Sequence, residues 1–308
     1  MIAENKFSKI VALWKEDKKQ YVKRSTFAAY TLLIENHILP SFGEMALVEE
    51  QDVQTFVFRK LNEGLSHKTI KDILIVLKMI LRFGAKNQMT EYRQIDIKFP
   101  TGRDKHSIDI LNRSHQKQIM EYIRLHFTFK NLGIYICLSA GMRIGEICAL
   151  TWDDLDVENG IIHVRKTIQR IYVIEEHRKY TEVILDTPKT KNSIREIPMT
   201  KNLLKMIRPI KKIVNGNFYV LTNEPKPTEP RTYRNYYKQF MQSLGLPLIK
   251  FHGLRHSFAT RCIESKCDYK TVSVLLGHSN ISTTLNLYVH PNLEQKKRCM
   301  EQMSRLLR

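Results

Sequence analysis

Apolar positions recur at helical spacing through the first hundred residues of the chain. Phe7, Ile10 and Trp14 predict one amphipathic helix. A second helix is predicted to begin at Ser25, which would cap it, and to end at Pro40. The pattern is typical of helices that bury one face in a shared core and leave the other face in water.

Two further helices are predicted in this part of the chain. One runs from Val53 to Gly64, and Ser66 caps a longer one whose apolar positions share a face: Ile70, Ile73, Leu74, Leu77, Ile80 and Leu81. Helices with short connections predict a small bundle, which we assign to residues 1–98. Residues 99–107 break the periodicity with proline, glycine and charge, and predict a linker.

From residue 108 to residue 308 the pattern is mixed. Helices are predicted around 119–125 and over 132–140, followed by strand-like segments at 161–164, 171–174 and 183–185. The last of these leads into a predicted hairpin, whose tip near Asn192 carries Lys189, Lys191 and Arg195.

A helix over 200–214, a brief strand at 218–221 and a helix with an aromatic face over 233–244 follow, and that aromatic face is expected to lie in the core. The predicted fold is mainly α with a small antiparallel β-sheet. In it a helical domain (1–98) precedes an α+β domain (108–308).

Composition and charge favour a folded chain with an anionic partner. The 308 residues are 43% hydrophobic, as expected for a core-forming protein. Fifty Lys and Arg against 31 Asp and Glu give a net charge of +19, which favours nucleic acid first and an anionic membrane surface second. No apolar run approaches the ~18 residues of a membrane span, and the N-terminus lacks a secretory signal. We therefore expect a cytoplasmic protein without a membrane partner.

Side chains suited to binding a phosphate lie in the second domain. Arg143 stands at a predicted helix start, where free N–H groups and the helix dipole favour an anion; the alternative is a surface arginine paired with Glu146. His252 and Arg255 are three residues apart at another helix start and can share one face. Two guanidiniums would stabilise the charge on the equatorial oxygens of a phosphorane.

Tyr288 adds a hydroxyl that could act as a nucleophile. Its reference pKa of ~10 means that it needs a proton acceptor or a cationic setting when it attacks. His252 or His278 could accept that proton or bind phosphate oxygen. A lysine of the predicted hairpin, Lys189 or Lys191, could protonate the leaving 5′-hydroxyl, because residues two apart on a strand share a face.

In this order the motifs resemble those of the tyrosine recombinases of the phage-integrase family, with Xer-like and transposon-type members. The segments that carry the resemblance are Ala140-Gly141-Met142-Arg143-Ile144-Gly145-Glu146, Leu150-Thr151-Trp152, Pro188-Lys189-Thr190-Lys191, His252-Gly253-Leu254-Arg255-His256-Ser257, Leu276-Gly277-His278 and Tyr288. The resemblance covers nearly all of the second domain. The helical bundle is similar to the SAM-like core-binding domain of that family.

The resemblance implies roles for the site residues. Arg143 and Arg255 would clamp the scissile phosphate. His252 would support them and exchange protons, and His278 would hydrogen-bond a phosphate oxygen. Tyr288 would attack and form a 3′-phosphotyrosyl link, so that DNA is cleaved and rejoined at a specific site.

Lys189 would be the general acid, with Lys191 as the competing assignment, and Glu146 would support the loop of the first arginine. No ATP and no metal are implied, because the covalent link conserves the phosphodiester energy. A zinc site near His252, His256, Cys262 and Cys267 is the weaker alternative, since the cysteine spacing fits no zinc pattern.

The implied partner is double-stranded DNA at core recombination sites. The bundle begins within the first ten residues, so we expect recognition of core sites alone, at the nucleoid. The family implies a homo-tetramer on DNA, in which a C-terminal helix docks on the neighbouring protomer; docking on its own domain is the alternative. The apolar seam of that helix is Leu293, Met300, Met303 and Leu307.

Two other functions share parts of this pattern. A topoisomerase IB-like relaxase would use the same chemistry as a monomer without site preference. A non-catalytic DNA-binding regulator would not need Arg143 or Tyr288. The interval of ten residues between His278 and Tyr288 further predicts a loose turn before the helix of the tyrosine.

Overall fold

The structure, a computed structural model, describes residues 6–91, 94–100, 109–175, 178–188, 191–288 and 293–306, and for some of these, including Lys191 and Tyr288, the backbone alone. The chain divides into two compact units. The first comprises Met1–Lys105 and Ile171–Glu182, and the second His106–Arg170 and Val183–Arg308. Helices dominate both units and the sheets are small, so the predicted fold class is confirmed.

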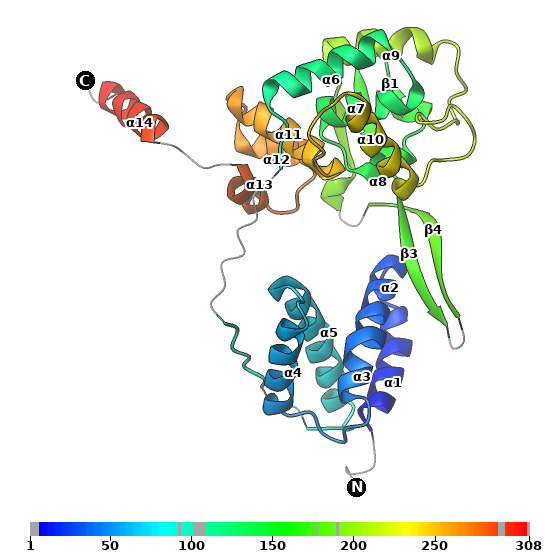
Figure 1. Ribbon diagram of the computed structural model, residues 1–308, viewed down its shortest axis with the longest axis vertical. Coiled ribbons are helices and arrows are strands. Elements are labelled where there is room, and N and C mark those ends of the chain that lie inside the picture. Colours follow the sequence, from blue (N-terminus) through cyan, green and yellow to red (C-terminus); the bar gives the residue numbers. More distant parts are fainter. Residues whose placement is uncertain are drawn as a thin grey trace. The chain divides into compact units, whose positions relative to one another are not determined.

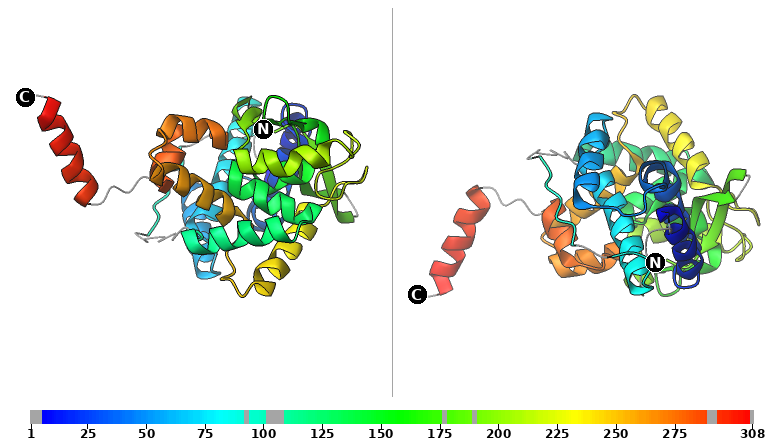
Figure 2. Two further views of the ribbon diagram at one scale, coloured as in Figure 1. Left: turned by 90° about the horizontal axis from the view of Figure 1, so that it is seen from above. Right: turned by 90° about the horizontal axis from the view of Figure 1, so that it is seen from below.

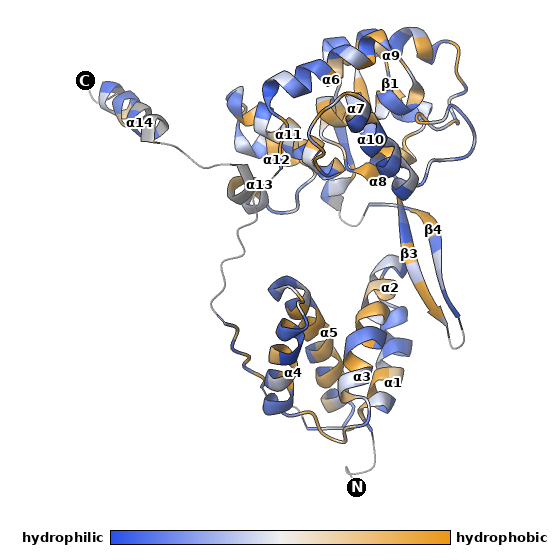
Figure 3. Cartoon of the chain, viewed as in Figure 1, coloured by the Kyte–Doolittle hydropathy of each residue, from blue (hydrophilic) through white to orange (hydrophobic). Residues whose placement is uncertain are grey.

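The first unit is a helical bundle (Figure 1). Its helices are α1 (Phe7–Lys19), α2 (Arg24–Leu33), α3 (Leu39–Phe42), α4 (Glu50–Asn62) and α5 (His67–Lys86). The predicted cap of the longest helix is confirmed, because the Ser66 hydroxyl accepts a hydrogen bond from the backbone N–H of Thr69 at 3.1 Å. Figure 3 shows that α5 has a hydrophobic and a hydrophilic side, and its apolar residues form the centre of this core.

The second predicted helix differs from the structure at both ends. Ser25 is not its cap, since α2 begins at Arg24 and Ser25 is buried in the first turn. Pro40 does not end the helix either. The backbone widens into a π-helical turn, η1 (Ile34–Ile38), and Pro40 then lies in the first turn of α3. Pro40 has no N–H to donate, and it follows a π-helical turn in which the Leu39 N–H donates to the Ile34 carbonyl, five residues back, so the hydrogen-bond pattern is already shifted where the proline stands.

A β-hairpin of β3 (Thr167–Glu175) and β4 (Arg178–Asp186) forms a sheet of its own. Its outer part, Ile171–Glu182, belongs to the first unit, where Glu182 accepts two hydrogen bonds from the Arg24 guanidinium at 3.0 and 2.5 Å. The sequence predicted one sheet for all strand segments. This was wrong, because the pairing of strands depends on partners distant in the chain.

The second unit is built around a buried helix, α7 (Phe129–Ala140), in which every residue from Asn131 to Ala140 is buried. Four helices pack against it: α6 (Arg113–Leu125), α8 (Ile144–Ala149), α9 (Lys201–Lys211) and α11 (Phe251–Glu264). The predicted aromatic-faced helix is α10 (Pro230–Ser243), and its Tyr233 and Tyr237 are buried in the core as expected.

The last helices of this unit are α12 (Tyr269–Leu276), α13 (Ile281–Tyr288) and α14 (Leu293–Leu306). The first two pack on each other and on α11 at one end of the unit (Figure 2). In the described part of the chain, no helix is both long and apolar enough to cross a membrane.

The second sheet contains β1 (Leu155–Asp156), β2 (Ile161–Val164) and β5 (Arg195–Pro198), which are antiparallel in the order β1-β2-β5. Because β5 pairs with β2 and not with β4, the segment 187–194, which includes the 3-10 turn η3 (Lys191–Ser193), connects two sheets and is not the predicted hairpin tip. The strand predicted at 218–221 is reduced to isolated bridges of Tyr219 with Thr151 and Glu224.

Candidate active site

Arg143 is the residue that caps α8, directly after the sharp end of α7. Gly141 ends α7 with φ of 62°, and a side chain there would collide with the Phe258 ring at 2.4 Å. The Arg143 guanidinium donates to Glu146 Oε1 at 2.8 Å and to the Gly277 carbonyl at 2.9 Å. Its backbone N–H donates to Glu146 Oε2 at 2.8 Å, so this one amide is not available to an anion, and the pairing of Arg143 with Glu146 that was the alternative prediction is present.

Arg255 lies on α11 and is 1% exposed. It donates from Nη1 to the Gly141 carbonyl at 2.7 Å and from Nη2 to the Leu276 carbonyl at 2.6 Å. Arg143 and Arg255 therefore bind the carbonyls of two consecutive residues, Gly277 and Leu276. Both predicted arginines are fixed at the end of α12, immediately before His278.

Glu146 joins Arg143 to a third arginine. Its carboxylate, 2% exposed, accepts from Arg195 at 3.1 and 2.9 Å in addition to Arg143. Burial alone would raise the pKa of Glu146, but the hydrogen bonds and charges of Arg195 and Arg143 outweigh burial and lower it. The carboxylate stays ionised, and the implied support of the Arg143 loop by Glu146 is present.

His278 follows the arginine-bound carbonyls and is held by α13. Gly277 ends α12 in the left-handed conformation, with φ of 65°, and the turn directs His278 Nδ1 to the hydroxyl of Thr284 at 2.9 Å. Thr284 is fully buried. Burial and the charges of Arg255 and Arg143 lower the pKa of His278 to about 4. The imidazole is therefore neutral at pH 7.

His252 lies one turn before His256 on α11, with ring centroids 4.6 Å apart. Burial and the charges of His256, Arg255 and Arg143 lower the pKa of His252 to about 4, so it is neutral at pH 7 as well. The structure thus brings together four of the predicted site residues, which are Arg143, His252, Arg255 and His278.

Two predicted residues are described less completely. Tyr288 is the last residue of α13, the helix that packs on α11 and α12, and only its backbone is described. Lys189 lies outside the described residues, and Lys191, the competing assignment, is described as backbone in η3. The three-residue turn from His278 to Asn280 precedes α13, and Asn280 Oδ1 accepts from the Ser282 N–H at 2.8 Å.

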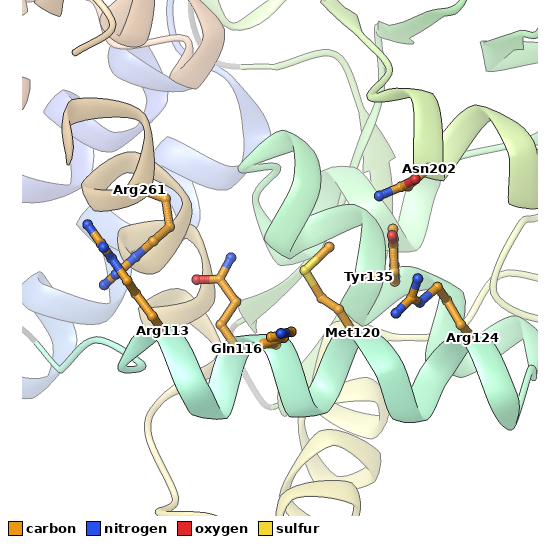
Figure 4. A pocket seen from close by; sticks show the side chains of 8 residues that line it. Arg113, Gln116, Met120, Arg124, Tyr135, Asn202 and Arg261 are labelled. Carbon is orange, nitrogen blue, oxygen red and sulfur yellow. The ribbon is translucent and has the colours of Figure 1, made fainter. Parts of the chain in front are cut away.

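A hollow of about 660 Å³ adjoins His278. It is lined by Arg195, Lys270, Asn192 of η3 and the turn before α13, among others. A smaller cavity of about 300 Å³ lies elsewhere on the unit, between α6, α7, α9 and α11 (Figure 4). Among the described site residues, none of Arg143, His252, Arg255 and His278 lines that second cavity. The described residues contain no group of three or more His, Cys, Asp or Glu that could hold a metal ion.

Sequence reasoning misplaced one residue of the site and missed another. Arg195 was assigned to a mobile hairpin tip, but it lies on β5 and its side chain is 4% exposed. The two-residue period of β5, in which Ile197 is also buried, is the signal that could have found it. Thr284 lies on the apolar face of α13 between Ile281 and Leu285, and no polar role was predicted for it.

Two arginines fixed on adjacent carbonyls, two histidines that are neutral at pH 7 and a helix that ends in tyrosine are groups suited to phosphoryl transfer. Residues 109–295 match the model of the phage integrase family, and residues 6–60 match that of the phage integrase N-terminal SAM-like domain. The chain belongs to the phage integrase family, and it is a tyrosine recombinase that transfers DNA strands.

Curated relatives agree with this assignment. The chain is 31% identical, over 92% of its length and 78% of the relative's, to a "Tyrosine recombinase XerC-like" protein of Caldanaerobacter subterraneus subsp. tengcongensis. It is 24% identical to the ICEBs1 integrase of Bacillus subtilis, over 89% of this chain and 76% of that protein.

Solved structures show the same fold. The Tn1549 transposon integrase in complex with transposon right end DNA is 22% identical, with a TM-score of 0.79 over 97% of this chain and all of that chain. A lambda integrase tetramer bound to a Holliday junction is 16% identical, with a TM-score of 0.63 over 95% of this chain and 81% of that chain.

Proposed function

We propose that this recombinase cleaves double-stranded DNA with Arg143, Lys189, His252, Arg255, His278 and Tyr288. The observation that carries the proposal is the attachment of Arg143 and Arg255 to the consecutive carbonyls of Gly277 and Leu276. This arrangement fixes two permanent charges beside His278. A phosphodiester that enters there would meet donors that require no rearrangement, which is the condition for stabilising charge in the transition state.

The nucleophile in this proposal is Tyr288. Its oxygen bonds to phosphorus while the bond from phosphorus to the 5′-oxygen breaks, and the 3′-phosphate becomes attached to the tyrosine. The phenol proton goes to a base, and we assign this role to His252, which is neutral at pH 7 and becomes more basic once the phosphate offsets the charges of the two arginines. Arg143 and Arg255 neutralise the equatorial oxygens in this step.

The leaving 5′-oxygen must gain a proton. We assign this step to Lys189, with Lys191 as the competing residue, because both stand in the sequence between β4 and Asn192, which lines the hollow beside His278. His278 hydrogen-bonds a phosphate oxygen. If Thr284 donates to Nδ1, the neutral ring carries its proton on Nε2 and can donate it to the phosphate.

The partner that we propose is a double-stranded core site, bound at the nucleoid. The net charge of +19 supports a polyanionic partner, and solved relatives of the same fold were obtained with DNA. Residues 1–98 are proposed as the core-binding domain, residues 99–107 as the linker and residues 108–308 as the catalytic domain. The basic faces of the bundle would contact phosphates on the DNA.

We further propose a homo-tetramer on DNA that is linked by the C-terminal helix. In α14 the side chains of Met300 and Met303 are 60% and 43% exposed. They are three residues apart and share a helix face, which supports docking on a neighbouring protomer over docking on the same domain. The lambda integrase relative was obtained as a tetramer.

The experiment that tests the catalytic proposal traps the covalent intermediate. A library of random duplexes with single nicks is incubated with the protein, since loss of the short strand at the nick prevents religation. The covalent adducts are isolated and the attached DNA is sequenced, which also identifies the site. Wild type is expected to form adducts on a common sequence through Tyr288.

The matched control is Tyr288→Phe, which keeps the ring and removes the nucleophile. It should bind the selected site and form no adduct. Absence of an adduct with wild type, or an equal yield with Tyr288→Phe, would contradict the proposal. Adducts spread over all sequences would contradict the site-specific part of it and favour a relaxase.

A further inference from the structure

Arg195 lies at the meeting point of the segments that form the proposed site. It is the first residue of β5, where it pairs with Val164 of β2. Its side chain is 4% exposed. The guanidinium donates four hydrogen bonds, one each to the carbonyls of Ser193 and Leu275 and two to the carboxylate of Glu146.

Each partner of Arg195 belongs to a different part of the site. The Leu275 carbonyl accepts from Nε at 2.7 Å, directly before the Leu276 and Gly277 carbonyls that hold the two other arginines. The Ser193 carbonyl accepts from Nη1 at 3.0 Å, at the end of the segment that carries the candidate lysines. The carboxylate of Glu146 accepts from Nη1 and Nη2 at 3.1 and 2.9 Å.

The contact with Glu146 is the one that bears on Arg143. Glu146 is buried between the two guanidiniums, so its negative charge is shared between them. Without Arg195 the carboxylate would interact with Arg143 alone, which would draw that guanidinium inward and reduce its charge toward a phosphate. The end of α12 would lose its Leu275 anchor at the same time.

We propose that Arg195 is a positioning residue for DNA cleavage, acting through Glu146 and the Leu275 carbonyl to set Arg143 in place for the phosphate. The proposal rests on the cleavage function proposed above. Arg195 does not itself contact the DNA in this account, because its side chain is buried and its bonds run to protein groups.

The test compares Arg195→Met with wild type on the nicked duplex identified by adduct sequencing. Methionine has a similar length and leaves no unpaired donor. We expect DNA affinity to change by less than about threefold and the single-turnover cleavage rate at saturating protein to fall about 100-fold, as a misplacement of ~1 Å produces. Arg165→Met is the matched control, since Arg165 is exposed and directly follows Val164, the last residue of β2. It should cleave like wild type.

A second substrate distinguishes the route by which Arg195 acts. It carries sulfur in place of the bridging 5′-oxygen, and the sulfur leaves as a thiolate that needs no proton. Lys189→Ala, or Lys191→Ala if that lysine is the acid, should be restored by this substrate. Arg195→Met should not be restored, because its defect lies at Arg143. Equal restoration of Arg195→Met would overturn the proposal and place Arg195 in support of the lysine segment alone.

A double variant separates positioning from a general loss of structure. If Arg195 acts through Glu146, Glu146→Gln combined with Arg195→Met should cleave no slower than the slower single variant. Additive losses would overturn the proposal. If Arg195→Met does not fold, Arg195→Lys takes its place, and it must show the same slow cleavage with unchanged DNA affinity. If wild type and the Arg195 variants cleave DNA equally well, only the role of Arg195 is rejected. If wild type forms no adduct at all, the proposed function is rejected.

Discussion

Arg143 and Arg255 are held by adjacent peptide carbonyls, of Gly277 and Leu276, although the two arginines come from helices more than a hundred residues apart in the chain. The carbonyls lie at the end of α12, where Gly277 turns the backbone with φ of 65°. Because both guanidiniums share this anchor, a shift at the end of α12 would move both together. The consequences can be tested at the arginines, at the histidines and at the neighbouring helix.

Replacing Arg255 by lysine should abolish most of the cleavage activity while the protein remains folded. Lysine keeps the charge, but it cannot donate at once to Gly141, to Leu276 and to a phosphate in the fixed directions of a guanidinium. We expect the single-turnover cleavage rate to fall by about 10²–10³. Cleavage of the nicked site at saturating protein measures this.

Arg261→Lys on the same helix is the control, since Arg261 donates to Glu264 and lies outside the site. It should cleave at the wild-type rate. If Arg255→Lys cleaved as fast as Arg261→Lys, the buried guanidinium would have a structural role only.

Thr284→Val should slow DNA cleavage through its effect on His278, although Thr284 itself is not proposed to contact the DNA. Valine has the shape of threonine, but it removes the hydroxyl that hydrogen-bonds His278 Nδ1 at 2.9 Å. A hydrogen bond of this kind contributes about 1 kcal/mol, so roughly fivefold slower cleavage is expected, with thermal stability within a few degrees of wild type.

The adjacent Thr283 is exposed, and Thr283→Val is the matched control. The proposed role of Thr284 fails if both valine variants cleave alike. His278→Ala should remove the difference between them, because the hydroxyl then has no ring to orient.

Part of the candidate site could be predicted from the sequence alone. Arg143, His252 and Arg255 could be predicted because helix starts and their spacing are local features of the chain. Arg195 could not be placed, because its position depends on β5 pairing with β2 across the inserted hairpin, and hydrophobic alternation does not name a partner strand. The choice between Lys189 and Lys191 stays a prediction.

The two histidines should couple DNA binding to proton uptake. In the free protein the pKa values of His252 and His278 are lowered to about 4 by burial and by the neighbouring arginines. A phosphate between the arginines offsets their charge, though not the burial that is the larger cause, and should raise both pKa values above 4. Binding then takes up protons between pH 4 and 6.5, so affinity rises as pH falls through this range.

Calorimetry at pH 5.5 in buffers of different ionisation enthalpy measures the uptake, which should be positive at that pH and vanish at pH 8. His252→Gln and His278→Gln should each reduce the uptake and retain binding at pH 8. The free protein should also lose stability as pH drops from 6.5 to 4, because the unfolded chain binds protons there that the folded histidines do not. Uptake that is unchanged in both variants would refute this coupling.

The C-terminal helix should be required for assembly on DNA and not for folding. Met300 and Met303 are exposed on α14, and burial of a methionine contributes roughly 1.5–3 kcal/mol. Met300→Lys combined with Met303→Lys should therefore weaken association between protomers on the order of 100-fold. Native mass measurements on the selected DNA site should show tetramers for wild type and single bound protomers for the double variant, with equal melting temperatures.

Gln302→Lys provides the control, because Gln302 is exposed on the same helix and outside the seam, and it should assemble like wild type. Loss of assembly in Gln302→Lys would show that added positive charge, and not the methionine seam, is the cause. Tetramers of the Met300 and Met303 double variant would exclude the seam as the link between protomers. Mixed tetramers of wild type and the double variant test whether the helix of each protomer docks on the next one. If it does, a tetramer with a single variant protomer should lose one of its interfaces between protomers.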